Sequence, residues 1–483
     1  MSTITTTLPN NSFHARRAAR STTGLAFVLL LTGCATLSDD GGFSAVESET
    51  QNALGLQSRW LKRDMDNQTT RTEVSKLLTG TLSAESAMQI ALFNNPRLQA
   101  EYANLGISEA DLVQAGRIPN PGFSFGKNSG GGAQDIERGL HFNVMAILTM
   151  PWRVGIETRR FKAAKLAAAQ ATVETAFEAR SAYFEAIAAR QSTAYYRQVL
   201  ASAEASRDLM RRMARVGNSS RLELAREQLF HAEASAALAQ AIQRQSATRE
   251  TLIQALGLWG KQTAFRLPER LPDLPETARD SANIEQTAIA KRLDIRRSRH
   301  SLDGLADNLG LTKATRFVNV FEAGPVQVRE RGEAVLNGYE VSLEIPIFDW
   351  GSARVARAEA IYTQGIERLR ATAINARSQV RQAYLDYRTN YDLAKHYRDE
   401  IVPLRKRISD ENLLRYNGML IGVFELIADA REQVKSVSAY VDALRAFWVA
   451  DTRLELAMLA NAGNSVGGMA STLSPSGAEG GGH

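Results

Sequence analysis

The side chains best suited to chemistry are scattered along this chain and form no familiar catalytic pattern. Neither a phosphate-binding lysine loop nor a nucleophile elbow occurs, and the histidines lack metal-ligand spacing. The six histidines are His14, His141, His231, His300, His396 and His483. His141 and Met145 could form a soft-metal pair on one face of a strand, but ordinary strand residues explain them as well. We therefore predict a protein that is not an enzyme and has no metal site and no cofactor.

One cysteine, Cys34, indicates a covalent modification. Three arginines without any acidic residue precede an apolar run over residues 24–31, an order typical of a secretory signal peptide. The segment Leu31-Thr32-Gly33-Cys34 resembles a bacterial lipobox, in which the cysteine becomes the first mature residue and carries lipid. We expect residues 1–33 to be a lipoprotein signal peptide and Cys34 to be lipidated; a chance cysteine beside an ordinary cleavage site is the alternative. Ala35, in place of an aspartate, is typical of sorting to the outer membrane.

Composition narrows the class of protein further. Removal of residues 1–33 takes away three cations and no anion, so the formal charge falls from +6 to +3 and gives no case for binding nucleic acid. Hydrophobic residues at 44% and charged residues at 23% are ordinary for a folded chain. The apolar run over residues 24–31 is too short to cross a bilayer as a helix. A bundle of membrane-spanning helices is therefore excluded.

The elements that position these side chains occur twice, because the chain contains an internal repeat. The segment Arg180–Glu185 parallels Arg381–Asp386 at an offset of 201 residues, and Gly217 parallels Gly418 at the same offset. The dense prolines after Leu267 separate the two halves, because proline stops helices and favours extended chain. We divide the chain into a lipidated N-terminal tether over 34–80 with at most one short helix, a first repeat over 81–266, a proline-rich linker over 267–280, a second repeat over 281–462 and a disordered tail over 463–483.

Each repeat is predicted to run helix, two short strands, very long helix, glycine turn and helix, which makes the fold mainly α with a small β part. Alternating apolar residues indicate the strands, and a coiled-coil stripe indicates the long helices. In the first repeat we expect strands over about 121–127 and 139–150, a long helix over about 157–216 and a second helix over about 219–257. In the second repeat we expect strands over about 316–324 and 338–346, a long helix over about 352–417 and a second helix over about 421–461. Pro403 is expected to kink the last long helix.

The strands carry one apolar face and one wet face. In the last strand Tyr339, Val341 and Leu343 alternate with Glu340 and Ser342. A hairpin on a soluble core gives the same pattern. If the strands enter a membrane instead, several chains must share one barrel, because an open sheet edge cannot be satisfied by lipid. Three chains supply twelve strands, enough for a water-filled bore, whereas two supply only eight.

Several segments in this order resemble the TolC-type outer-membrane efflux protein family over about residues 80–462. The segments are Ala91–Leu98, Pro119–Phe125, Ile345–Gly351, Leu222-Glu223-Leu224 and Phe424-Glu425-Leu426. The resemblance implies a homotrimer with a twelve-stranded barrel in the outer membrane, continued by a periplasmic α-helical barrel. The segment over 150–155 departs from the family pattern and leaves the start of the first long helix uncertain.

The resemblance also implies partners and a task. The chain would be the lipid-anchored exit duct of a tripartite efflux system or a type I secretion-like complex, passing small molecules from an inner-membrane pump and a periplasmic adaptor to the exterior. Outer-membrane lipid is a further partner, and nucleic acid is not. The alternative is a periplasmic coiled-coil adaptor or scaffold lipoprotein without a pore. Nothing in the residues identifies the exported substrate.

Two sets of site residues follow from the resemblance. The glycine turns become periplasmic tips that dock the adaptor, since glycine suits a helix end that turns with positive φ. This set comprises Val216, Gly217, Asn218, Ser219 and Gly418. Glu223, Glu425 and Asp429 follow the tips, and threefold symmetry would turn each into a ring of gate carboxylates. Glu425 and Asp429 share a helix face at a spacing of four, although plain helical hairpins with solvated faces explain both sets equally.

Overall fold

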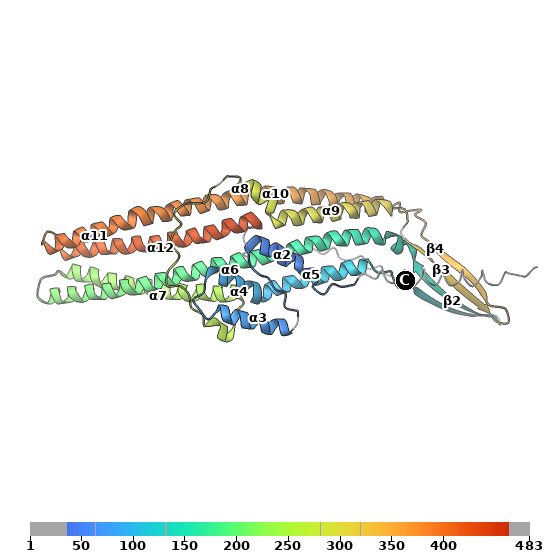
Figure 1. Cartoon of the computed structure of the whole chain (residues 1–483), viewed down its shortest axis with the longest axis horizontal. Helices are drawn as coiled ribbons and strands as arrows, with labels where there is room; N and C mark the ends of the chain where they lie inside the picture. Colours follow the sequence, from blue (N-terminus) through green and yellow to red (C-terminus); the bar gives the residue numbers. More distant parts are fainter. Residues whose placement is uncertain (1–35, 63, 131–132, 281, 319, 463–483) are drawn as a thin grey trace, which may run out of the picture. The chain divides into compact units, whose positions relative to one another are not determined.

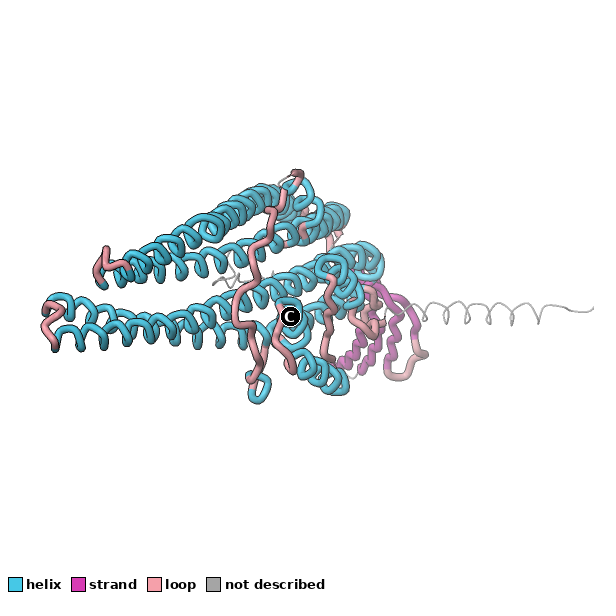
Figure 2. Tube along the Cα trace, turned by 60° about the vertical axis from the view of Figure 1, so that its left-hand side comes forward, coloured by secondary structure: helices cyan, strands magenta, loops and turns pink. Residues whose placement is uncertain are grey.

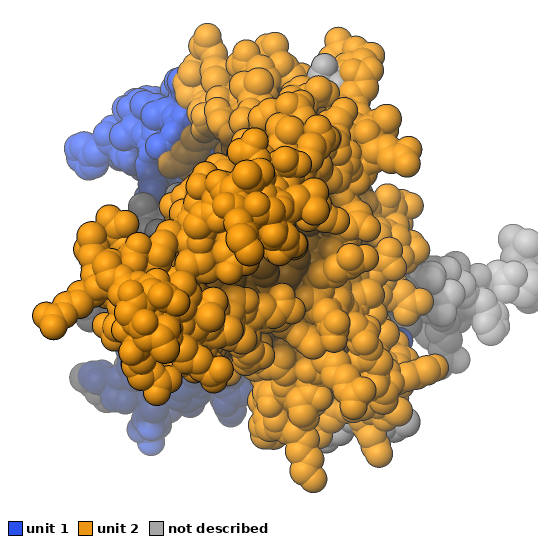
Figure 3. Space-filling model, turned by 90° about the vertical axis from the view of Figure 1, so that its left-hand side faces the viewer, with its two compact units in different colours: residues 1–42, 106–162, 301–365 blue, residues 43–105, 163–300, 366–483 orange. Residues whose placement is uncertain are grey.

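The computed structural model describes residues 36–62, 64–130, 133–280, 282–318 and 320–462 (Figure 1). The expected signal peptide over 1–33, Cys34 and the tail over 463–483 lie outside the described residues. The described chain forms two compact units, coloured separately in Figure 3. Unit 1 contains Gly106–Lys162, Ser301–Gly365 and the described residues up to Gly42, and unit 2 contains the remaining segments.

Unit 1 holds one antiparallel sheet, whose strands are magenta in Figure 2. The strand order is β1-β2-β3-β4. The strands are β1 (Gly122–Gly130), β2 (Ala133–Asn143), β3 (Phe321–Glu330) and β4 (Leu336–Leu343). The first repeat thus supplies two strands and the second repeat the other two, and β2 pairs with β3 at the junction. Among the described residues, the outer strands β1 and β4 leave two open sheet edges.

The strand expected over 139–150 was wrong beyond Asn143. Helix α6 (Val144–Arg215) begins directly after β2, because the Asn143 Oδ1 atom accepts a hydrogen bond of 2.7 Å from the Ala146 amide and caps the new helix. Met145 is therefore helical and does not share a strand face with His141. The long helix starts thirteen residues before the expected position of about 157, with Pro151 inside it.

The third strand also lies later than the expected range of 316–324. Phe317 belongs to the turn after helix α9 (Leu293–Ala314), and β3 extends to Glu330 with Pro325 in its middle. Proline is rare in central strands because it cannot donate to the ladder. Gly324 lets the backbones come close here: an added Cβ would lie 1.5 Å from the Leu140 carbonyl oxygen.

Two long antiparallel helical hairpins dominate unit 2 (Figure 1). The first pairs α6 with α7 (Arg221–Leu256). The second pairs α12 (Val423–Leu459) with a helix in three parts: α10 (Ser352–His396), a π-helical turn (Tyr397–Ile401) and α11 (Val402–Asn417). The turn lies immediately before Pro403, whose missing amide disrupts regular helical hydrogen bonding at the expected kink site.

Shorter helices complete the chain. They are α2 (Phe43–Leu54), α3 (Asp64–Leu77), α4 (Ala84–Asn94), α5 (Pro96–Ala115), a 3-10 turn (Gly260–Thr263), α8 (Ile284–Lys291) and α9. The tether expected over 34–80 thus contains two helices rather than at most one. Phe43 packs edge-on against Tyr102 with ring centroids 4.9 Å apart, so this segment is anchored to α5 by aromatic burial.

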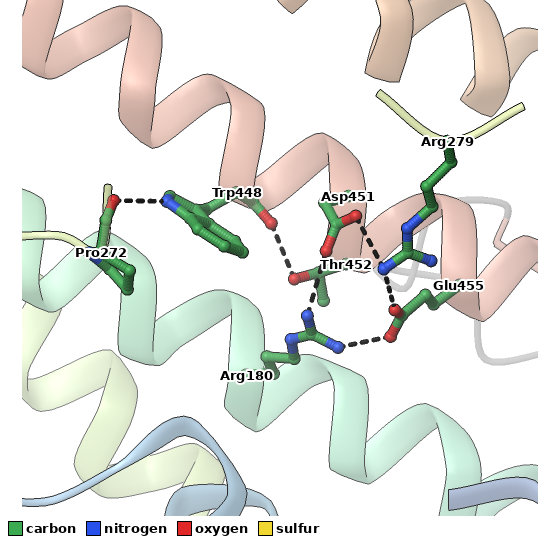
Figure 4. A network of polar contacts seen from close by, with 7 residues as sticks. All are labelled: Arg180, Pro272, Arg279, Trp448, Asp451, Thr452 and Glu455. Atoms are coloured by element: carbon green, nitrogen blue, oxygen red, sulfur yellow. Dashed lines mark hydrogen bonds and ion pairs between the residues drawn. The ribbon is translucent and has the colours of Figure 1, made fainter. Parts of the chain in front are cut away.

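The linker over 267–280 is extended and bound by both repeats. Leu267, Leu271 and Leu274 are buried, and the Pro272 carbonyl accepts a 3.0 Å hydrogen bond from Trp448 Nε1. Figure 4 shows the linker's Arg279 bridging to Asp451 and Glu455 on α12 at 3.1 and 2.5 Å. Arg180 of α6 pairs with the same two carboxylates. Burial raises the pKa of the Asp451 carboxyl group, and the charges of both arginines oppose that shift. The network pairs two arginines with two carboxylates and so joins the first repeat, the linker and the second repeat.

Candidate functional sites: the sheet and the hairpin tips

The sheet has an apolar face whose large side chains are exposed. Strand register places Phe123 opposite Leu140, Ala323 opposite Val341 and Phe321 opposite Leu343, and directly opposed residues share a face. The exposed members of this apolar face are 40% to 85% accessible: Phe123, Phe125, Leu140, Phe142, Tyr339, Val341 and Leu343. The sheet therefore presents hydrophobic surface that the described part of the chain leaves uncovered.

The opposite face of the sheet is polar. His141 and Ser124 hydrogen-bond there at 2.8 Å between Nε2 and Oγ. The carboxylates of the strands all lie on this acidic face: Asp135, Glu137, Glu322, Glu330 and Glu340. The predicted alternation of Tyr339 and Val341 with Glu340 and Ser342 agrees with this register.

Aromatic side chains gather at the helical end of the sheet. Phe317 meets Trp350 edge-on at 6.4 Å between centroids, and Arg316 lies over the Phe317 ring at 4.3 Å. Gly351 has a φ of +71°, and a Cβ there would lie 2.5 Å from the Arg316 carbonyl oxygen, so glycine is needed to bring Trp350 to this place. Trp152 of α6 is also exposed. Such aromatic residues next to an apolar band are typical of a membrane–water interface.

The first hairpin tip, between α6 and α7, is fully capped. Gly217 has a φ of +80°, and the Asn218 amide donates to the Met213 carbonyl at 2.9 Å, which closes α6. Ser220 and Glu223 form a capping box at the start of α7. The Ser220 amide donates to Glu223 at 2.7 Å, and this bond lowers the pKa of the Glu223 carboxyl group. The Glu223 carboxylate therefore caps the start of its own helix, α7.

The second tip, between α11 and α12, is built differently. Gly418 has a φ of −81°, so the positive φ expected there was wrong; Met419 carries it instead, at +56°. Gly422 is the N-cap of α12 and has no side chain to satisfy the first amides. Met419 is 93% exposed and Leu420 is nearly as open. This tip therefore combines an uncapped helix with an exposed apolar loop.

Glu425 and Asp429 lie one turn apart on α12, as their spacing predicts. Glu425 is exposed, whereas Asp429 is half-buried. The Asp429 Oδ2 atom is screened from solvent and has no hydrogen-bond partner among the described residues. Within the described ranges, no group of three or more histidine, cysteine or acidic side chains could hold a metal ion. Glu223, on the other hairpin, does not join these two carboxylates.

Glu227 is a contact residue that sequence reasoning missed. It is 2% exposed and accepts hydrogen bonds of 2.7 Å from both Arg431 and Ser206, so it links the first hairpin to α12. The triplet Arg226–Gln228 recurs as Arg431–Gln433 in the second repeat, which pairs Glu227 with Glu432. Glu432 is half-exposed, and it pairs with Lys435 of its own helix at 2.7 Å and with Arg405 of α11 at 3.6 Å. The identical triplets Arg226–Gln228 and Arg431–Gln433 give no sign of this difference.

A cavity of about 730 Å³ lies among α5, α6, α7, α9 and α12 in unit 2. Its charged lining mixes both signs: Arg97, Arg297, Arg453, Glu101, Glu174, Glu178 and Glu185. Burial raises the pKa of Glu174, which accepts a 2.7 Å hydrogen bond from Gln170. Because the charges nearly balance, the cavity shows no preference for a ligand of either charge.

No helix among the described residues combines the length and apolarity that a membrane crossing requires. No family model matches the chain, and no curated protein sequence matches it.

Solved structures, in contrast, match most of the chain. A membrane protein from Pseudomonas aeruginosa superimposes with a TM-score of 0.68 at 18% identity, over 78% of this chain and 93% of that one. The outer-membrane channel OprN gives 0.65 at 16% identity, over 88% and 97%. The outer membrane channel CmeC of Campylobacter jejuni gives 0.65 at 15% identity, over 78% and 85%.

These matches define the class to which the fold belongs. The chain has the fold of outer-membrane channel proteins, with a duplicated helical hairpin and a four-stranded sheet. The resemblance to the TolC-type family is confirmed at the level of the fold. Identities of 15% to 18% in these three matches carry the comparison no further than architecture.

Proposed function

We propose that this protein is the exit duct of an outer-membrane efflux complex. Three copies supply twelve strands to one barrel in the outer membrane, and their helical hairpins continue the duct in the periplasm. The observation that carries the proposal is the four-stranded sheet, with an exposed apolar face and two unpaired edges, in a chain with an outer-membrane channel fold. A periplasmic scaffold without a pore would not explain why this face exposes large apolar side chains.

The open edges β1 and β4 support a shared barrel. Lipid offers no partner for unpaired backbone groups, so each edge must pair with the opposite edge of another copy. Three sheets give twelve strands and room for a water-filled bore, whereas two give eight and an interior filled by side chains. The acidic face then lines the bore and the apolar face meets lipid.

The hairpin tips are the proposed docking surface for a periplasmic adaptor, which in turn contacts an inner-membrane pump. Val216, Met419 and Leu420 expose apolar surface there. Gly217, Asn218, Ser219 and Gly418 shape the two turns. In this proposal Cys34 carries lipid that anchors the chain to the outer membrane, and the substrate is a small molecule.

The gate is proposed to lie on the second hairpin. Glu425 and Asp429 share a face, and threefold symmetry would gather six carboxylates where α12 lines a narrow end. The unsatisfied Asp429 Oδ2 atom supports this role, because a cation or a proton would supply the missing partner. Glu223 contributes less, since its charge already serves the α7 cap.

Arginine substitutions in β4 test the barrel directly. Val341→Arg on the apolar face, which lies further from the helical end of the sheet than Leu343, should cost up to about 2–4 kcal/mol per chain and impair insertion, whereas Ser342→Arg on the wet face should insert normally. The measurement is the yield of detergent-extracted trimer from outer membranes, followed by conductance in planar bilayers. Equal insertion of both variants, or recovery of the wild-type chain as a water-soluble monomer, would contradict the proposed function.

A further inference from the structure

The charges of the sheet are sorted by face. The strands contain three lysines or arginines, Lys127, Arg138 and Arg329, and all three lie on the apolar face. Register shows this because Lys127 opposes Ile136, Ile136 opposes Arg329, and Arg138 opposes Phe125. Every strand carboxylate lies on the acidic face instead. Alternation within the strands therefore yields one face with cations only and one with anions only.

The three cations lie at one end of the apolar face, toward the turns that join β1 to β2 and β3 to β4. Lys127 and Arg329 share a row with Ile136, one row inside the uncharged pair Ser129 and Gln134, and Arg138 lies in the next row beside Phe125. The following rows, about 7 Å apart along a strand, are apolar: Phe123 with Leu140, then Phe142, Ala323 and Val341, then Phe321 with Leu343. The face thus changes from cationic to apolar within two rows.

A groove lies where the two parts meet. It has a volume of about 310 Å³, and its lining combines the apolar residues Phe123, Leu140 and Pro325 with the polar residues Arg138, Gln327 and Asn337. Lys127, Arg138 and Arg329 are exposed and form no ion pair within the described chain. An occupant with an apolar part and an anionic part matches this groove, because guanidinium groups bind phosphate through paired hydrogen bonds.

We propose that this surface binds lipid A, the acylated and phosphorylated disaccharide of lipopolysaccharide. Its phosphates contact Lys127, Arg138 and Arg329, and its acyl chains cover Phe123 and the apolar rows. The inference rests on the proposed function, under which the strand turns reach the outer leaflet. Charge complementarity favours an anionic lipid over a protein, because the cationic rows lie directly beside apolar rows that acyl chains can cover.

Neutralising the cations tests the inference. The triple variant K127Q/R138Q/R329Q should carry several-fold less lipid A per trimer than wild type when extracted gently from outer membranes and analysed by mass spectrometry. The matched control D135N/E137Q/E340Q changes the same number of charges on the acidic face and should keep the wild-type amount. Equal lipid A in wild type and the K127Q/R138Q/R329Q trimer would overturn the proposal.

Defined membranes separate the possible sources of the signal. Wild-type trimer in zwitterionic nanodiscs should gain thermal stability when lipid A is added, but not with dephosphorylated lipid A or with phosphatidylglycerol. The triple variant should show no gain with any of them. Equal stabilisation by phosphatidylglycerol would overturn the choice of lipid A, and equal stabilisation by the dephosphorylated form would overturn the role of the phosphates.

Failure of this inference differs from failure of the proposed function. A conducting trimer with unchanged lipid content in the variant refutes only the lipid site, whereas a water-soluble wild-type monomer refutes both. If the triple variant fails to insert, the single substitution R138Q removes the cation at the groove and makes the same comparison. The charge-preserving variant K127R/R138K/R329K should retain lipid A.

Discussion

The two hairpin tips descend from the same repeat, yet they are stabilised to different degrees. The first has a glycine with positive φ, a capping box and one continuous helix leading to it. The second has a methionine with positive φ, a glycine N-cap and a helix interrupted by a π-turn. Capping and left-handed strain each act at about the 1 kcal/mol level, so the second tip should open locally more often. The duplicated hairpins thus differ in local stability: we expect the first tip to be firm, that is, to unfold locally less often than the second.

The largest expected effect concerns the contact between the hairpins. Glu227→Ala should destabilise the packed tips by about 2–3 kcal/mol, because Arg431 and Ser206 both lose a charged hydrogen-bond partner. The repeat-equivalent Glu432→Ala is the matched control and should cost less than about 1 kcal/mol, since the ion pairs of Glu432 with Lys435 and Arg405 are partly exposed to solvent. Hydrogen exchange of α7 and α12 measures both. Equal costs would show that the two halves support their tips alike.

A smaller effect concerns the caps. Ser220→Ala should weaken the start of α7 by about 1 kcal/mol, whereas Gly422→Ser should strengthen the start of α12 by a few tenths. Because the Glu223 pKa is lowered in the folded chain, its contribution is complete above the unfolded pKa and is lost as the pH falls through the folded value. Proteolysis at each tip at neutral and acidic pH provides the measurement. Unchanged cleavage in S220A would contradict the firm first tip.

The smallest effect on stability should come from the gate carboxylates. Glu425→Gln with Asp429→Asn should leave trimer yield unchanged but weaken divalent-cation block of the channel current several-fold. Glu223→Gln on the first tip is the control and should leave the block near the wild-type level. Single-channel recordings in planar bilayers compare them. If both variants behave like wild type, the α12 carboxylates lie on a solvated outer face.

The sequence predicted the parts of the fold that depend on repetition and periodicity. The repeat around Tyr183 and Tyr384 located both long helices, and alternation around Leu343 identified the faces of β4. The errors lie at element boundaries, where a single residue is compatible with two local structures. Asn143 could extend a strand or cap a helix, and only its bond to the Ala146 amide decides for the cap. The third strand was expected to end at about 324, whereas β3 continues through Pro325 to Glu330, with Gly324 allowing the close approach to β2.

The sites were less predictable than the elements. Glu223, Glu425 and Asp429 stand in similar sequence positions, but one caps a helix while another hides an oxygen atom from solvent. Lys127, Arg138 and Arg329 come from three strands, and only the register brings them to one end of one face. Partners that lie far apart in the chain leave no local pattern to read.

The four-residue charge network of Arg180, Arg279, Asp451 and Glu455 sets an order on folding. Arg180 and Asp451 are 271 positions apart, whereas the two helices of each hairpin are joined by a few residues at the tip. Local contacts close early and distant ones late, since a long loop must be ordered first. The first helical hairpin can therefore form while the chain is still emerging, but the second hairpin and the charge network must wait for α12. The network between the repeats can therefore form only after α12 has been synthesised, because α12 supplies both of its carboxylates.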